Sequence, residues 1–154
     1  MNEEQKTIAL NCTELEKYQP NRYPFLMIDR VKIISENKIA IGIKKLKKND
    51  WYFKSHFYNN NPVFPGTLQT ECMLQSTIVA LYRDKEKIKK FFIIKTETNF
   101  TSKIIKPCNL NIHVKILKNK NGIVLSEASI LLNSKKVSDG KFTFIDPKKF
   151  KIKK

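Results

Sequence analysis

Residues 62–82 read PVFPGTLQTECMLQSTIVALY, and this stretch decides the fold of the 154-residue chain. Pro65 and Gly66 mark a sharp entry into a helix, with Thr67 as the candidate N-cap. The residues that follow are apolar on almost every side, unlike the one-sided stripe of a surface helix. The pattern therefore predicts a long helix that is buried at the centre of the protein.

A polar stripe runs along this predicted helix, because Thr67, Glu71 and Gln75 are spaced four residues apart and share one face. Isolated carboxylates are rarely buried without a partner or a purpose. Glu71 could form a salt bridge with one of the many lysines. Alternatively, desolvation by its apolar neighbours would raise its pKa and keep it partly protonated, which suits a general acid.

Strand patterns lie on both sides of the helix, at residues 31–34, 38–46, 91–100, 110–118, 123–133 and 137–145. Asn121-Gly122 and Asp139-Gly140 are hairpin signals, so the last three strands should form an antiparallel meander. A short helix is expected within 13–18. The order predicts one α+β domain over residues 1–154, with an antiparallel sheet wrapped around one long central helix and a basic, frayed tail from about 148.

Composition excludes several classes of protein. The net charge is +16, yet only three of the 30 basic residues are arginines and the lysines are spread along the chain, so sequence-specific nucleic-acid binding is not expected. The charge indicates either a solvated lysine-rich surface or an acidic partner. Three scattered cysteines indicate free thiols. Neither a membrane span nor a secretory signal is visible, so we expect no membrane association and a cytoplasmic location.

The two histidines have different settings. His113 alternates with apolar residues in a strand pattern and is expected to be a solvated strand residue. His56 lies between a strand and the central helix, in a loop that contains Pro62 and Pro65, and loops on rigid scaffolds often carry function. It could either tether this loop by a hydrogen bond or act as a base beside Glu71. A metal site is not expected, because no third ligand stands near the pair in sequence.

Three motifs together resemble one known family. They are RYPFLMIDRV at residues 22–31, the stretch from His56-Phe57 to Pro62-Val63-Phe64-Pro65-Gly66, and ECMLQ at residues 71–75. The chain is similar to the FabZ-type (3R)-hydroxyacyl-acyl carrier protein dehydratases from about residue 15 to residue 144. The resemblance implies a hot dog fold and a hydro-lyase of fatty-acid or related acyl-chain biosynthesis. No metal or other cofactor is implied.

The resemblance also implies roles for individual residues. His56 would be the general base that removes the α proton of the acyl thioester. Glu71, contributed across a homodimer by the other subunit, would help the 3-hydroxyl leave as water. The amide of Gly66 would bind the thioester carbonyl, and Phe57, Tyr58 and Gln75 are further expected substrate contacts.

An acidic acyl carrier protein would be the partner, and the dimers often assemble further into trimers of dimers. Candidate contacts for the carrier protein are Arg83, Lys89, Lys90, Lys103 and Lys106. Ser55, Tyr58, Asn21 and the pair Cys108-Asn109 depart from the family pattern and leave the range of substrates open. The alternatives are a hot dog thioesterase, or a non-enzymatic module that binds an acyl carrier protein or a nucleic acid.

Overall fold

A computed structural model describes residues 7–57, 61–81, 90–105 and 107–149 of the chain. Residues 7–149 contain, in chain order, β1 (Ile8–Leu10), α1 (Cys12–Leu15), β2 (Arg30–Ser35), β3 (Ile39–Leu46), α2 (Trp51–Ser55), α3 (Gly66–Ala80), β4 (Phe92–Phe100), β5 (Cys108–Lys120), β6 (Ile123–Leu132) and β7 (Lys135–Ile145). The predicted α+β class is confirmed. The six predicted strands all form, with ends that differ from the prediction by a few residues.

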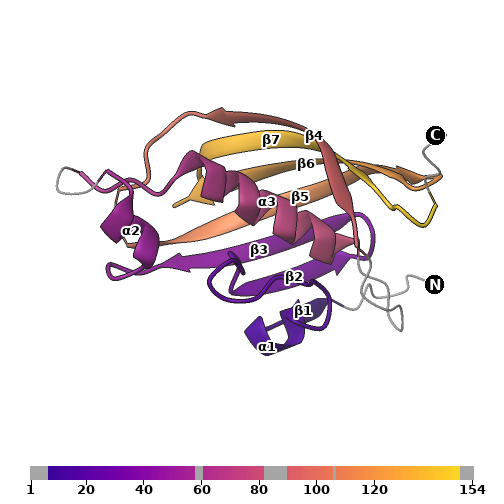
Figure 1. Cartoon of the computed structure of the whole chain (residues 1–154), viewed down its shortest axis with the longest axis horizontal. Coiled ribbons are helices and arrows are strands. Elements are labelled where there is room, and N and C mark those ends of the chain that lie inside the picture. Colours follow the sequence, from indigo (N-terminus) through magenta and orange to yellow (C-terminus); the bar gives the residue numbers. More distant parts are fainter. Residues whose placement is uncertain (1–6, 58–60, 82–89, 106, 150–154) are drawn as a thin grey trace.

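One antiparallel sheet contains every described strand, in the order β1-β2-β3-β5-β6-β7-β4. The long helix α3 crosses one face of this sheet (Figure 1). Strand residues that point toward α3 are buried and alternate with more exposed ones, as in β5, where Leu110, Ile112 and Val114 are buried. The sheet therefore wraps around the predicted central helix, and the core lies between the two layers.

Close packing between α3 and β3 depends on a glycine. A Cβ atom added to Gly42 would lie 2.2 Å from Ser76 Oγ and 3.1 Å from Ser76 Cβ. A side chain at position 42 would therefore require Ser76 to move, and the glycine lets α3 lie close to β3. This contact helps to set the position of α3 against the sheet. It therefore also helps to set the position of Glu71, which belongs to α3.

One of the two hairpin predictions is confirmed and the other is wrong. Asn121 and Gly122 have φ angles of 54° and 78° and connect β5 to β6. Asp139 and Gly140, in contrast, lie inside β7, where Gly140 pairs with Ala128 on one side and Thr98 on the other. A Cβ atom at Gly140 would meet the Phe142 ring at 2.5 Å, so this glycine serves side-chain packing rather than a turn.

The turn between β6 and β7 is made by Asn133 and Ser134, with φ angles of 49° and 65°. The meander of the last three strands is thus correct, although its second turn lies a few residues earlier than predicted. Thr67 is not the N-cap of α3: Pro65 occupies that position, and the helix begins at Gly66. No described helix combines the length and apolarity needed to cross a membrane.

Candidate active site

The short helix α2 positions His56. Its last residue is Ser55, and the backbone amide of His56 donates to the Tyr52 carbonyl at 2.9 Å. The His56 ring is half-buried, and its Nδ1 lies 2.8 Å from the Val63 carbonyl oxygen. Because a carbonyl can only accept, Nδ1 is the nitrogen that carries the hydrogen. The lone pair of neutral His56 is then on Nε2, which is left available as a base.

The tether and the base are therefore compatible roles for one histidine, since each uses a different nitrogen. The next residue, Phe57, stacks on the His56 ring with 4.2 Å between ring centroids and has a left-handed φ of 56°. Its side chain is 62% exposed, so it can contact a ligand. The φ angle of Ser55 is outside the left-handed region, so the backbone at this position does not require a glycine. The expected contact Tyr58 lies outside the described residues.

The N-terminus of α3 begins directly after Pro65, and its first backbone amides have no partner within the helix. Gly66 is the first helical residue, and the N-cap, Pro65, provides no side-chain hydrogen bond. The Phe64 amide donates to the Ile104 carbonyl at 2.8 Å, which anchors the segment before the helix. A Cβ atom on Gly66 would lie 3.0 Å from the Phe100 ring. The first amides of α3 are thus well placed to stabilise a negatively charged oxygen.

Glu71 lies in the second turn of α3 and is half-buried. Desolvation by burial raises the pKa of its carboxyl, and a hydrogen bond from Gln75 opposes part of that rise. The Gln75 Nε2 donates to Glu71 Oε1 at 2.7 Å. Glu71 is therefore bound to an amide and not to a lysine, which removes the salt-bridge alternative for the described part of the chain.

Gln75 itself is fully buried, although a substrate contact was expected of it. Its Nε2 also donates to the Phe25 carbonyl at 2.7 Å, and its Oε1 accepts from the Met27 amide at 2.8 Å. Thr67, the third residue of the polar stripe, is exposed. Within the stripe, Gln75 is thus satisfied by the backbone of Phe25 and Met27, a contact that the sequence pattern did not reveal.

Within one chain, His56 and Glu71 have separate partners. His56 is bonded to Val63, and Glu71 is bonded to Gln75. Neither a hydrogen bond nor an ion pair joins the two side chains in the described structure. Sequence reasoning also missed α2, which positions His56, because five residues are too few to show a helical period.

Comparisons with known proteins show the family of the chain. Residues 19–141 match the model of the FabA-like domain family, which covers most of the chain. The chain belongs to the FabA-like family. The 3-hydroxyacyl-acyl-carrier-protein dehydratase FabZ of Vibrio cholerae is 36% identical over 121 residues, covering 76% of this chain and 78% of the relative. FabZ of Buchnera aphidicola is 32% identical over 140 residues, covering 88% and 92%.

Among solved structures, the dehydratase heterocomplex ApeI:P from Xenorhabdus doucetiae matches with a TM-score of 0.71 at 16% identity, over 86% of this chain and 90% of that chain. A hypothetical thioesterase from Streptococcus pneumoniae matches less well, with a TM-score of 0.56 at 10% identity, over 71% and 79%. These two likenesses concern the fold alone. The predicted hot dog fold and the resemblance to FabZ-type dehydratases are confirmed, and the family identifies the chain as a hydro-lyase.

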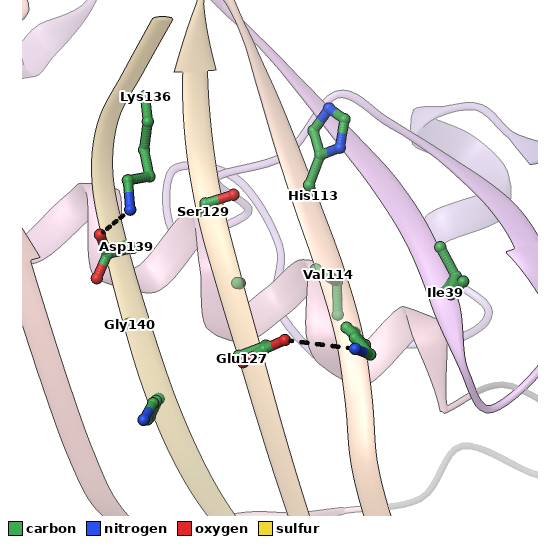
Figure 2. A pocket seen from close by; sticks show the side chains of 11 residues that line it. Ile39, His113, Val114, Glu127, Ser129, Lys136, Asp139 and Gly140 are labelled. Atoms are coloured by element: carbon green, nitrogen blue, oxygen red, sulfur yellow. Dashed lines mark ion pairs between the residues drawn. The ribbon is translucent and has the colours of Figure 1, made fainter.

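A hollow of about 450 Å³ lies on the sheet face that points away from α3 (Figure 2). His113 is exposed there, as predicted. Two ion pairs lie among the residues that line the hollow, Lys136 to Asp139 at 2.8 Å and Lys115 to Glu127 at 3.8 Å. The described residues contain no group of three or more His, Cys, Asp or Glu side chains that could hold a metal ion. This mixed-charge face is separate from the His56 and Glu71 elements.

Proposed function

We propose that this hydro-lyase converts (3R)-hydroxyacyl thioesters, carried on an acyl carrier protein, to trans-2-enoyl thioesters. The observation that carries the proposal is the combination of a histidine with a free Nε2, a helix N-terminus without a cap, and a half-buried carboxyl of raised pKa in one FabA-like domain. The relatives FabZ of Vibrio cholerae and of Buchnera aphidicola are named for this reaction.

The reaction needs one proton removed and one delivered. Nε2 of His56 takes the α proton, and the electron pair moves toward the thioester carbonyl, whose oxygen accepts a hydrogen bond from the Gly66 amide. Glu71 of the partner subunit gives its proton to the 3-hydroxyl. The C3–O bond breaks, the C2–C3 double bond forms, and the hydroxyl leaves as water. A carboxyl whose pKa is raised by burial is suited to this task, because it holds its proton at a higher pH.

A dimer is proposed because β4 is an edge strand without cover. Among the described strands β4 pairs only with β7, so its other edge has no partner strand within that part of the chain. Ile93 and Phe100 pair with the inward-facing Phe144 and Ser138, yet they are 43% and 50% exposed. A long, apolar, unpaired edge is a template for pairing with another strand. Pairing of two β4 strands would extend the sheet across the dimer and bring the two α3 regions toward each other.

The acyl carrier protein is proposed to dock beside Lys103. This residue is exposed, and it precedes Ile104, whose carbonyl binds the Phe64 amide next to the N-terminus of α3. Lys90 is also exposed but lies just before the opposite end of β4. Arg83, Lys89 and Lys106 lie outside the described residues. Lys103 is therefore the candidate that is best placed to guide an acidic partner to the site.

Hydration of a crotonyl thioester tests the function in the reverse direction. Loss of enoyl absorbance without release of free thiol is the expected result. Release of thiol from saturated acyl thioesters, with no change in enoyl absorbance, would identify a thioesterase instead. Absence of both reactions, with the acyl carrier protein as well as with a pantetheine thioester, would contradict the proposed enzyme.

A further inference from the structure

Both hydrogens on Gln75 Nε2 and the oxygen Oε1 have hydrogen-bond partners. Nε2 donates both of its hydrogens, to Glu71 Oε1 and to the Phe25 carbonyl, each at 2.7 Å. Oε1 accepts from the Met27 amide at 2.8 Å. Because a backbone carbonyl only accepts and a backbone amide only donates, the two ends of the Gln75 amide cannot be exchanged. The orientation of this side chain is therefore set by the backbone of residues 25–27.

This orientation has a consequence for Glu71. Its Oε1 already accepts a hydrogen from Gln75, so a proton on Oε1 would have to compete with that bond. The hydrogen bond of the Glu71 carboxyl within the described residues uses Oε1, which leaves Oε2 without a partner there. We propose that Gln75 is a positioning residue that confines the acidic proton of Glu71 to Oε2 and holds this oxygen toward the substrate. The inference rests on the proposed function, in which Glu71 is the acid.

The charged surroundings of Glu71 are simple. The adjacent Cys72 thiol has its pKa raised to about 12, chiefly by burial and in smaller part by Glu71, so this thiol stays neutral. Asp29 and Lys44 act on Cys72 and are paired with each other at 3.4 Å. In the proposed dimer, His56 of the partner subunit also faces the carboxyl. Burial raises the pKa of Glu71 and the Gln75 bond lowers it, so loss of that bond should raise it further.

A purely structural role for Gln75 can be separated from positioning. The Cys72 thiol donates to the Met27 carbonyl at 3.3 Å, so it also attaches the 25–27 segment to α3. It does so without a hydrogen bond to Glu71. Cys72→Ala therefore weakens the same attachment and leaves the Gln75–Glu71 bond in place, which makes it a matched control.

The test compares Gln75→Met, Gln75→Glu, Cys72→Ala and Glu71→Gln with the unmodified protein. Crotonyl-pantetheine hydration gives kcat and KM, and carbon-13 NMR of labelled glutamate gives the pKa of Glu71, assigned with Glu71→Gln. For both Gln75 variants we expect kcat to fall about 10²-fold, the cost of a misplaced reacting group, with less change in KM. The pKa of Glu71 should rise in both, because Gln75→Met removes the donor and Gln75→Glu adds a second carboxyl one turn away.

Gln75→Glu preserves the size of the side chain. Its kcat and its Glu71 pKa therefore test the positioning role even if Gln75→Met does not fold. The control Cys72→Ala should retain kcat and the pKa of Glu71. If a folded Gln75 variant keeps the kcat and the Glu71 pKa of the unmodified protein, the positioning role is overturned. It is also overturned if Cys72→Ala loses as much kcat as the Gln75 variants and the pKa of Glu71 changes in none of them. Full activity of Glu71→Gln would instead overturn the proposed function, so the two failures are distinguishable.

Discussion

Gln75 Nε2 lies 2.7 Å from Glu71 Oε1, one turn apart on the same face of α3. The same amide is held by the backbone at Phe25 and Met27. A segment nearly fifty residues earlier in the chain thus holds Gln75 in place, and Gln75 in turn holds the candidate acid Glu71. This arrangement explains why the carboxyl of Glu71, in a largely buried helix, keeps a defined position.

His56→Ala should lower the rate of crotonyl thioester hydration by about 10²- to 10⁴-fold, the usual contribution of a general base. The chain offers a matched control, because its other histidine, His113, is exposed on the opposite face of the sheet. His113→Ala should keep the activity. Activity that survives in His56→Ala, or that is lost equally in both variants, would remove His56 from the mechanism.

Glu71→Gln should stabilise the protein at high pH. Burial raises the pKa of Glu71 above its ordinary value of 4.5, so the folded state retains a proton that the unfolded state releases. The contribution of this group to the free energy of unfolding therefore falls as pH rises from about 4.5 through the raised pKa. We expect Glu71→Gln to raise Tm by no more than about 2–4 °C at pH 8, a modest change for a domain of this size.

The difference in Tm should disappear near pH 4, where the carboxyl is protonated in both states. Scanning calorimetry at several pH values measures it. A Tm difference that is independent of pH, or one of opposite sign, would show that the folded state does not disfavour the charged carboxyl.

The hot dog fold was predictable because its central helix and its strands have distinct periods. The apolar run of α3 and the alternation in β3 and β5 both appear in the sequence. The second turn was misplaced because Asp139-Gly140 has the composition of a turn but packs inside a strand against Phe142. Local turn chemistry was overridden there by contacts between strands, which no short pattern encodes.

The site was predictable in part. His56, Gly66 and Glu71 stand out by residue type and by their motif, but the bonding of Gln75 to Phe25 and Met27 joins segments far apart in sequence. Amphipathic spacing placed Gln75 on the face of Glu71, and it could not say what lies opposite. The role of a buried amide depends on that partner, so only the folded chain reveals it.

Ile94→Lys should weaken the proposed dimer. Ile94 is a 58% exposed residue of the edge strand β4, and a lysine there would place a charge in a strand pair. Leu117→Lys is the control, since Leu117 is 49% exposed but belongs to the interior strand β5. Light scattering should find a species of more than one 18.1 kDa chain for the unmodified protein and the control. A monomer in all three samples would contradict the dimer.

Lys103→Glu should raise KM for an acyl carrier protein substrate by about 5- to 10-fold, because a charge at the rim of an interface mainly alters association. The kcat and the KM for a pantetheine thioester should not change. Lys90→Glu, at the other end of β4, provides the control for a simple change of net charge. Equal effects of the two substitutions would place the carrier protein elsewhere.

The most direct test of the central claim is the activity of mixed dimers made from His56→Ala and Glu71→Gln protomers. Each variant alone should have at most about a hundredth of the activity of the unmodified protein. After subunit exchange, a random mixture should recover about a quarter of the activity of the unmodified protein, because half of the dimers are mixed and each has one intact site. No recovery, with exchange demonstrated by differently labelled protomers, would show that His56 and Glu71 do not act across a shared interface.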